Sequence, residues 1–314
     1  MRFQHYKRAL ALLLGSLSIG IVSPTFSQGP ALTPTGKHPS LSSSAVLVLD
    51  QESGQVLYGK NSQAIVPIAS ISKLMTAMVV LDANLDPDEP ITVSNDDVDW
   101  LRGSSSRLQV GSTLTRDQLL RLALMASENR AAAALSRSYP TGRPGFIAAM
   151  NAKALSLGLT GTHFSDPTGL SSANVSTAED LAAMVSAAHA YPKIREYSTL
   201  PGQVMQVGKR SIAFHNTNGL VANPGWEIGL SKTGFINEAG RCLVMQAQLA
   251  GRAIIIVLLD SWGKYTRIAD ASRIRQWIEA AAGVRPATPK LVLQRVSLTH
   301  RHRHAARVTR SGRA

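Results

Sequence analysis

Continuous apolar runs near both ends of the chain predict the strands of a buried sheet. Each run is bounded by turn residues, a pattern typical of strands. The longer runs are Ser44–Asp50, Gln55–Tyr58, Arg241–Leu249 and Ala253–Leu259, and the shorter β-type runs are Gln203–Val207, Arg210–Phe214 and Glu227–Ser231. The turns at Ser53-Gly54 and Ala250-Gly251-Arg252 predict that the longer runs pair as two hairpins.

The middle of the chain follows a helical period instead. Apolar residues recur there every three or four positions, which predicts amphipathic helices. Ser176-Thr177-Ala178-Glu179 fits a capping box at the start of one of them. The predicted helices run from Ser70 to about Asn84, over Asp117–Ala126, Asn129–Ser138 and Gly145–Ser156, from the capping box to about Ala190, and over Tyr265–Ala282.

This order of elements predicts one fold class. Strands come from both ends of the body and helices come from its middle. We therefore expect a fold of the α/β class, more narrowly α+β, in which one antiparallel sheet of about five strands is covered by helices and carries an inserted all-helical subdomain. A cleft between the two parts is the expected place for a functional site.

The first 27 residues have the pattern of a secretory signal. Arg2, Lys7 and Arg8 form a basic start, the stretch 9–22 is apolar, and small residues follow it. This arrangement predicts a cleaved signal peptide at 1–27 and export to the periplasm. The apolar core is short for a transmembrane helix, so no membrane anchor is expected after cleavage. An uncleaved anchor is the alternative, and export is common to both.

Two further segments lie outside the main domain, which we place at residues 44–285. Residues 28–43 are rich in Pro, Ser, Thr and Gly and are predicted to be a flexible linker. Residues 286–314 combine Pro, Arg and His with little apolar periodicity, and we expect a basic, disordered tail. The alternative role for this tail is a basic patch attracted to anionic wall polymers or lipid.

Composition narrows the function classes. The formal net charge is +13, but residues 1–27 carry +3 and residues 290–314 carry +7, which leaves only +3 for the body. With few aromatic residues and no nucleic-acid motif in the body, a nucleic-acid partner is set aside. The single Cys242 excludes an intrachain disulfide, and its apolar neighbours predict a buried, inert thiol. The histidines show no metal-binding spacing such as H-E-x-x-H, so we expect neither a metal nor another cofactor.

The pair Ser70 and Lys73 is the first candidate for chemistry. On a helix, residues three apart share a face, so a hydroxyl would lie beside an amine that accepts its proton. A serine at a helix start also lies at the positive end of the helix dipole. The ordinary alternative is a capping serine and a solvated lysine. A second S-x-x-K, at Ser261 to Lys264, shows how often this spacing arises by chance.

Two more motifs follow in order along the chain. Ser127-Glu128-Asn129 falls in a turn between two predicted helices, and Lys232-Thr233-Gly234 ends a strand-like run. A second S-x-N at Ser172-Ala173-Asn174 shows that this pattern alone carries little information. The informative observation is the joint order: S-x-x-K at a helix start, S-x-N between helices and K-T-G at a strand end.

This set of motifs resembles the penicillin-binding protein and serine β-lactamase superfamily. Within it, the chain looks most like the D-alanyl-D-alanine peptidases of low molecular mass, in particular the penicillin-binding protein 7-type endopeptidases. The resemblance spans about residues 44–283, and the stretches that carry it are Pro67-Ile-Ala-Ser-Ile-Ser-Lys-Leu-Met-Thr-Ala77, Leu122-Ala-Leu-Met-Ala-Ser-Glu-Asn-Arg-Ala131, Asp166-Pro-Thr-Gly-Leu170 and Lys232-Thr-Gly-Phe235.

The resemblance implies a role for each site residue. Ser70 would attack the scissile carbonyl, Lys73 would accept its proton while neutral, and Ser127 would pass a proton to the leaving amine. Asn129 would hold Lys73 and a substrate amide. Lys232 and Thr233 would bind a substrate carboxylate. Desolvation would lower the pKa of Lys73, and so would the nearby cation of Lys232 if the fold brings it close. Gly234 would let substrate approach the strand, and the backbone N–H groups of Ser70 and Phe235 would form the oxyanion hole.

The implied function is a periplasmic serine D,D-peptidase that remodels peptidoglycan stem peptides and binds β-lactam antibiotics covalently. We expect an endopeptidase that cuts D-Ala–diaminopimelate crosslinks, partly because little chain follows the last predicted helix. A carboxypeptidase is the main alternative. A β-lactamase is disfavoured because the stretch 164–174 contains Asp166 but no E-x-x-L-N arrangement, and a non-catalytic penicillin sensor is a further alternative. The oligomeric state is left open.

Overall fold

The computed structural model describes residues 37–284. The predicted signal peptide, most of the predicted linker and the predicted basic tail lie outside the described residues. Within 37–284, no helix combines the length and the apolar character that crossing a bilayer requires.

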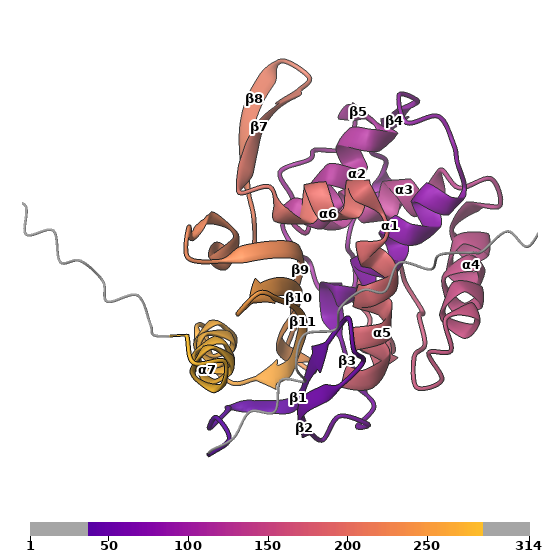
Figure 1. The fold of residues 1–314 in the computed structure, drawn as a ribbon. Helices are drawn as coiled ribbons and strands as arrows, with labels where there is room; N and C mark the ends of the chain where they lie inside the picture. Colours follow the sequence, from indigo (N-terminus) through magenta and orange to yellow (C-terminus); the bar gives the residue numbers. More distant parts are fainter. Residues whose placement is uncertain (1–36, 285–314) are drawn as a thin grey trace, which may run out of the picture.

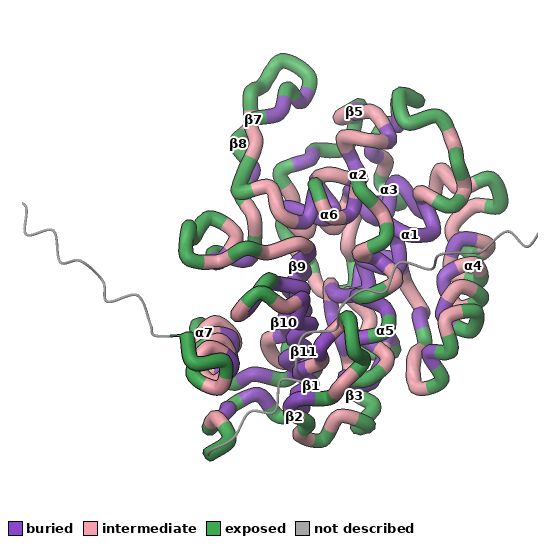
Figure 2. Tube along the Cα trace, viewed as in Figure 1, coloured by how far each residue is buried: buried purple, intermediate pink, exposed green. Residues whose placement is uncertain are grey.

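A five-stranded antiparallel sheet forms the centre of the molecule (Figure 1). Its strands lie in the order β2-β1-β11-β10-β9, so the first and last parts of the body meet where β1 pairs with β11. The strands are β1 (Ser43–Asp50), β2 (Val56–Lys60), β9 (Glu227–Ile236), β10 (Gly240–Leu249) and β11 (Arg252–Ser261). Figure 2 shows β10 and β11 as buried segments, which explains their long apolar runs: both faces of these strands are covered.

Helices cover the two faces of the sheet unequally. Along the chain, the six helices α1–α6 come after β2 and before β9. Helix α5 packs on one face of the sheet, and α7 packs on the other (Figure 1). The helices are α1 (Lys73–Asp82), α2 (Arg116–Met125), α3 (Asn129–Arg137), α4 (Gly142–Ser156), α5 (Ala178–His189), α6 (Pro192–Thr199) and α7 (Thr266–Ala281). The predicted α+β fold with a helical subdomain is confirmed.

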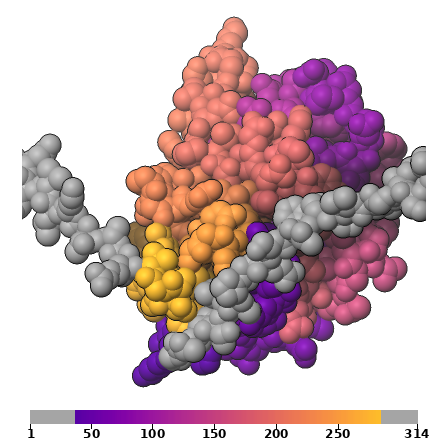
Figure 3. All heavy atoms as spheres, viewed as in Figure 1, coloured from indigo at the N-terminus to yellow at the C-terminus, as the bar shows by residue number. Residues whose placement is uncertain are grey.

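Short elements connect the two parts. The β7–β8 hairpin projects from the body (Figures 1 and 3), and the 3₁₀ turn η3 connects it to β9. The short strands are β3 (Val66–Pro67), β4 (Pro90–Thr92), β5 (Thr113–Thr115), β6 (Val175–Ser176), β7 (Gly202–Val207) and β8 (Arg210–His215), and the 3₁₀ turns are η1 (Ala69–Ser72), η2 (Asn95–Asp97) and η3 (Gly219–Ala222).

Two hydrophobic clusters hold the layers together. The larger cluster joins the helical part to one face of the sheet, and the smaller one lies between the opposite face and α7. The smaller cluster includes Leu41, and the ring of His38 lies 5.6 Å from that of Tyr58. The part of the predicted flexible linker that the structure describes is therefore packed against the body.

Several predicted boundaries differ from the structure. Lys232-Thr233-Gly234 lies inside β9 rather than at a strand end, because β9 continues to Ile236 in register with β10. The N-cap of α5 is Thr177, whose side chain accepts from the backbone of Asp180, so the predicted capping box at Ser176 is one residue early.

The helix ends and the shortest elements show further differences. Helix α1 ends at Asp82, two residues before the predicted Asn84, and α4 begins at Gly142 rather than Gly145. The sequence pattern did not reveal α6, β3, β4, β5 or β6. These elements are at most eight residues long, too short for a period to be read.

Candidate active site

Ser70 lies in the 3₁₀ turn η1, directly before α1. Its Oγ is 2.8 Å from the Nζ of Lys73, so the three-residue spacing brings hydroxyl and amine together as predicted. The preceding Ala69 has a φ of +49°, a region that alanine rarely occupies. Backbone strain of this kind persists where surrounding contacts hold it, and it often marks a functional turn.

Lys73 is completely buried, and its Nζ has three oxygen neighbours. Besides Ser70 Oγ, it donates to Asn129 Oδ1 at 2.7 Å and to the Thr168 carbonyl at 2.5 Å. Burial lowers the pKa of Lys73 to about 7, against the raising effect of Asp166 and Glu128. In the neutral amine the two N–H groups suit the two obligate acceptors, Asn129 Oδ1 and the Thr168 carbonyl. The lone pair is then left for the Ser70 hydroxyl, which is the arrangement of a general base.

The loop that supplies the Thr168 carbonyl is held by one carboxylate. Asp166 accepts from the backbone N–H groups of Thr168 at 2.6 Å, Gly169 at 2.8 Å and Ser171 at 2.8 Å. Gly169 has a φ of +81°, and a Cβ there would lie 2.0 Å from the Ala69 carbonyl oxygen. Only glycine permits this approach, so the Asp166 loop lies directly against the turn that carries Ser70.

Asn174 ties the same loop to the Ser70 turn, a role that the sequence reasoning missed. It is fully buried, its Oδ1 accepts from the backbone N–H groups of Ser165 and Asp166, and its Nδ2 donates to Ser72 Oγ at 2.9 Å. The S-x-N at Ser172 to Asn174, which we treated as chance, therefore has a structural role. Its spacing gave no signal of this, because every partner comes from tertiary contact.

Ser127 and Asn129 flank the start of α3, as predicted. Ser127 lies in the turn between α2 and α3 with a φ of +56°, a second strained non-glycine residue at the site. Its Oγ accepts from the Nζ of Lys232 at 2.8 Å. Asn129 Nδ2 donates to Ser104 Oγ at 3.0 Å while its Oδ1 faces Lys73, so this side chain bridges the base and a surface loop.

Lys232 is the second fully buried lysine of the site. Its pKa is lowered well below the usual value, first by burial and then by the charges of Lys73 and Arg267. Of the two expected causes of a lowered pKa at Lys73, burial is the one that acts there, and the repulsion between the two cations lowers the pKa of Lys232 instead.

The rest of the K-T-G motif aligns the edge strand β9 with the Ser70 turn. Thr233 Oγ1 donates to Thr217 Oγ1 at 2.6 Å. A Cβ on Gly234 would lie 2.8 Å from the Ile68 carbonyl oxygen and 3.2 Å from the Ser70 nitrogen. Gly234 thus allows the strand backbone to approach the nucleophile turn, rather than serving substrate access alone as predicted. Phe235 follows it and is half exposed.

Two charged residues at the site carry no motif and were missed. Arg267, from the first turn of α7, donates to the Gly234 carbonyl at 2.9 Å and to the Cys242 carbonyl at 3.1 Å, so it holds β9 from the opposite side. Glu128 is buried between Ser127 and Asn129 and contacts Ser106 Oγ, and burial raises its pKa. Arg267 belongs to no motif, and Glu128 occupies the variable position of the S-x-N motif, so neither residue type was predicted.

The remaining sequence candidates lie outside this cluster. Cys242 is buried, as predicted, and burial raises its pKa to about 11, which disfavours the reactive thiolate. Ser261 does not contact Ser70 or Lys73. Its Oγ lies 2.6 Å from Ser43 Oγ instead, where β11 pairs with β1. All eight predicted site residues, in contrast, belong to the turn η1, the start of α1, the α2–α3 turn, the start of α3 and β9.

Comparison with known proteins agrees with this geometry. The model of the D-alanyl-D-alanine carboxypeptidase family matches residues 33–263. A D-alanyl-D-alanine endopeptidase of Pseudomonas aeruginosa is 45% identical over 274 residues, 87% of this chain and 88% of the relative. A D-alanyl-D-alanine endopeptidase of Escherichia coli is also 45% identical, over 85% of this chain and 87% of the relative.

More distant relatives and solved structures point the same way. A D-alanyl-D-alanine carboxypeptidase of Bacillus subtilis is 31% identical over 78% of this chain and 65% of the relative. The crystal structure of a Streptomyces DD-transpeptidase matches with a TM-score of 0.73 and 30% identity, covering 78% of this chain and all of that one.

Proposed function

The chain belongs to the D-alanyl-D-alanine carboxypeptidase family, and from this membership we propose that it hydrolyses D-alanyl amide bonds in peptidoglycan stem peptides through an acyl-enzyme on Ser70. The observation that carries the proposal is the 2.8 Å contact between Lys73 Nζ and Ser70 Oγ in a site that buries the lysine completely. A nucleophile beside a base of matched pKa is the arrangement that covalent acyl transfer requires.

Acylation follows from the contacts of Lys73 and Ser127. The neutral Lys73 amine takes the Ser70 proton as Oγ bonds to the scissile carbonyl carbon. When the C–N bond breaks, the leaving nitrogen takes a proton from Ser127, which is replenished through the lysines. Lys232 Nζ donates to Ser127 Oγ at 2.8 Å, so Lys232 is placed to return a proton to Ser127.

Two sets of groups stabilise the reacting substrate: the backbone donors of the oxyanion hole and the side chains that bind substrate. The Ser70 and Phe235 backbone N–H groups bind the developing oxyanion, and the approach of Gly234 to Ser70 supports their alignment. Each donor of this kind contributes about 3–4 kcal/mol to the transition state in comparable enzymes. Lys232 and Thr233 bind the carboxylate of the leaving residue, and Asn129 binds an amide on the acyl side.

Deacylation transfers the acyl group to water. The water oxygen bonds to the acyl carbon, the ester bond to Ser70 Oγ breaks, and the proton lost by the water returns to Oγ. The peptide leaves with a free D-alanyl carboxylate. The Asp166 carboxylate is occupied by three backbone N–H groups, so it is poorly placed to activate a water as a fast β-lactamase would. We therefore expect stable penicillin adducts and slow turnover of nitrocefin, which argues against the β-lactamase alternative.

Within this chemistry we favour the endopeptidase. The relatives at 45% identity, which cover most of both chains, are named endopeptidases, whereas the carboxypeptidase relatives are about 30% identical. The bond cut would be the crosslink between D-Ala of one stem and diaminopimelate of another. Trimming of a terminal D-Ala uses the same Ser70 chemistry and is the second candidate, supported by the family description.

The test uses purified muropeptides and mass-spectrometric product analysis. A crosslinked tetra–tetra dimer should give two monomers, while pentapeptide monomer should be trimmed more slowly. If pentapeptide is trimmed and the dimer survives, the endopeptidase assignment is wrong and the carboxypeptidase takes its place. Peptidoglycan digestion without any product, alongside normal penicillin labelling, would indicate the sensor. Periplasmic location remains a proposal, since the predicted signal lies outside the described residues.

A further inference from the structure

One ion pair joins two walls of the catalytic cleft. Arg102 Nη2 lies 2.9 Å from each of the two carboxylate oxygens of Glu238. Arg102 belongs to the loop after η2, two residues before Ser104, whose hydroxyl accepts from Asn129. Glu238 lies in the turn between β9 and β10, three residues after Phe235. The pair therefore connects the Asn129 side of the cleft to the β9 side.

The same guanidinium also contacts the Asp166 loop. Arg102 Nε donates to the Leu170 carbonyl. Leu170 directly follows Gly169, which packs against the backbone of Ala69 and Ser70. Through this one side chain and its partner, the three segments that surround the nucleophile are tied to one another.

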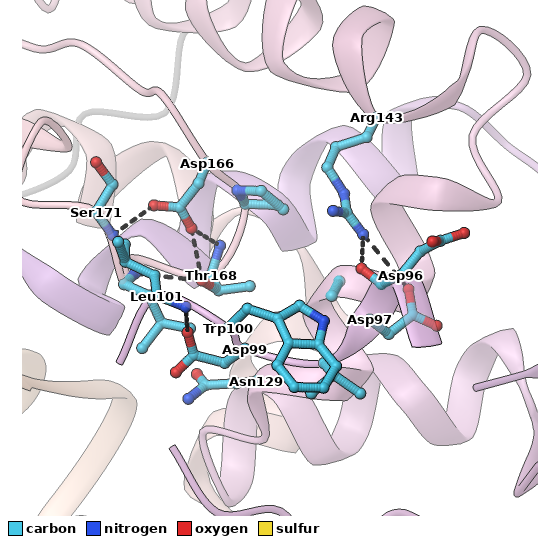
Figure 4. Close-up of a pocket in the computed structure, with 14 residues that line it drawn as sticks. Asp96, Asp97, Asp99, Trp100, Leu101, Asn129, Arg143, Asp166, Thr168 and Ser171 are labelled. Carbon is cyan, nitrogen blue, oxygen red and sulfur yellow. Dashed lines mark hydrogen bonds and ion pairs between the residues drawn. The ribbon is translucent and has the colours of Figure 1, made fainter. Parts of the chain in front are cut away.

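A cavity of about 300 Å³ adjoins the Arg102 end of the ion pair. Its walls come from three separate segments, which are residues 96–101, Asn129 with Ala133 and Arg143, and the Asp166 loop (Figure 4). Leu101 and Leu170, the neighbours of Arg102 along the chain and across its hydrogen bond, both line the cavity, whereas Glu238 does not. Arg102 therefore lies at the rim of the cavity, and its pairing with Glu238 bridges that rim and the β9–β10 turn.

The backbone is held at both ends of the ion pair. The Asp99 carboxylate accepts from the backbone N–H of Arg102 at 3.0 Å, which fixes the loop on one side. On the other side, the turn that carries Glu238 is closed by a hydrogen bond from the Ala239 N–H to the Ile236 carbonyl at 3.2 Å. Because both backbones are held, the connection opens when two side chains rotate, without a movement of either segment.

The ion pair is formed at neutral pH but is easily broken. The hydrogen bond from Arg102 lowers the pKa of Glu238, so this carboxylate is ionised across the neutral range. The two side chains are 23% and 46% exposed. Ion pairs with this exposure are screened by water and salt and add little to stability. A contact that stabilises the fold so little, yet joins the walls of an active site, is better explained by control of access.

We propose that Arg102 and Glu238 form a strap across the cleft that selects substrates by size. A compact acylating agent reaches Ser70 while the strap is closed. A crosslinked stem peptide extends on both sides of the scissile bond, and it occupies the cleft only when the pair has separated. The kcat/KM for such a substrate is therefore reduced to the fraction of enzyme in which the strap is open. The inference rests on the proposed function and adds to it a determinant of substrate choice.

The test compares a crosslinked tetra–tetra dimer with 6-aminopenicillanic acid, a compact acylating agent. Glu238→Gln and Arg102→Gln should each raise kcat/KM for the dimer about threefold, the scale that an exposed ion pair allows. Neither should change the rate constant of acylation by 6-aminopenicillanic acid, which also shows that the variants fold. The double variant should show no further gain, because either substitution alone opens the strap.

A second ion pair provides the matched control. Lys153 Nζ lies 2.9 Å from Asp82 Oδ2, and the two side chains are 25% and 41% exposed, close to the values of the strap. Asp82 ends α1, at the opposite end of this helix from Lys73. Asp82→Asn should therefore change neither the cleavage of the dimer nor acylation.

Salt gives an independent readout of the same pair. Raising the salt concentration should increase kcat/KM for the dimer in the wild type relative to Glu238→Gln, because screening weakens the pair only where it exists. The charge of the substrate is common to both proteins and cancels in this ratio. A ratio that does not change with salt would contradict the strap.

The outcomes that overturn the strap differ from those that overturn the proposed function. Dimer cleavage by Glu238→Gln at or below the wild-type rate would overturn the strap and leave the peptidase intact. Gains that add in the double variant would do the same, since the two residues would then act separately. No dimer cleavage by any of these proteins would overturn the proposed endopeptidase, and the strap with it.

Discussion

The chain contains two Ser-x-x-Lys sequences, and the structure treats them in opposite ways. Ser70 and Lys73 lie on a helical turn, with Oγ and Nζ 2.8 Å apart and the lysine completely buried. Ser261 ends strand β11, Gly263 follows with a φ of +86°, and Lys264 is exposed with its Nζ 5.4 Å from the Tyr265 ring centroid. The spacing is identical, but only a helix brings residues three apart onto one face.

Burial is the second difference between the two pairs. Lys73 loses its hydration, and its pKa falls to about 7, while its N–H groups face fixed acceptors. Lys264 stays in solvent. A reactive pair therefore needs the helical turn and a desolvated amine together. The cost of burying two lysines is evidence that the site is kept for chemistry rather than for stability.

The largest effect is expected from removing the base of the buried pair. Lys73→Met should slow acylation by fluorescent penicillin about 10³-fold, a typical loss for a general base. Lys264→Met should leave the rate unchanged. Stopped-flow labelling measures both rates, and thermal melting shows that both variants fold. Equal slowing of acylation in the two variants would contradict the claim that only Lys73 acts as a base.

A smaller loss is expected at the second buried lysine. Lys232→Met should slow acylation about 10²-fold, because the Ser127 contact and the carboxylate contact are lost together. The melting temperature should stay close to that of the wild type, since a desolvated cation that faces Lys73 and Arg267 is removed. A large drop in melting temperature with normal acylation would assign Lys232 to folding instead.

The pH profile tests the burial argument directly. Only neutral Lys73 accepts the Ser70 proton, and its pKa is lowered from 10.5 to about 7. The acylation rate constant should therefore rise about tenfold per pH unit below pH 7 and level off above it. Measurement between pH 5.5 and 9 is sufficient. A profile that keeps rising to pH 9 would mean that burial does not lower the pKa of Lys73 from 10.5 to about 7.

The smallest effect concerns the structural serine. Ser261→Ala removes the buried contact with Ser43 Oγ and should destabilise the fold by about 1 kcal/mol, a typical value for one hydrogen bond. Acylation by penicillin should be unaffected. Urea unfolding gives the free energy of unfolding, with Ser44→Ala, an exposed neighbour, as the control. Slower acylation in Ser261→Ala would link the second pair to the site.

Local pattern was sufficient for most of the fold. The apolar run Ala253–Leu259 predicted a buried strand, and the period along Tyr265–Ala282 predicted an amphipathic helix; the structure has β11 and α7 there. The short helix α6 escaped because eight residues, begun by Pro192, carry too little period. The end of β9 was misplaced because its pairing with β10, and not its composition, carries the strand through Gly234.

The motifs identified the candidate site residues but not their environment. Spacing placed Ser70 beside Lys73, yet it gave no information on the burial of Lys73, on Asn174 as the anchor of the Asp166 loop, or on Arg267 behind β9. These features depend on contacts between residues far apart in sequence. The cavity beside Asn129 is of the same kind, since its walls come from three separate segments.

The central claim is that Ser70, and no other serine, forms the covalent intermediate. Intact-protein mass spectrometry after exposure to benzylpenicillin, followed by peptide mapping, tests it most directly. The account predicts one adduct per chain, on the peptide that contains Ser70, absent from Ser70→Ala and fully retained in Ser261→Ala. An adduct that persists in Ser70→Ala, or that maps to the peptide of Ser261, would contradict it.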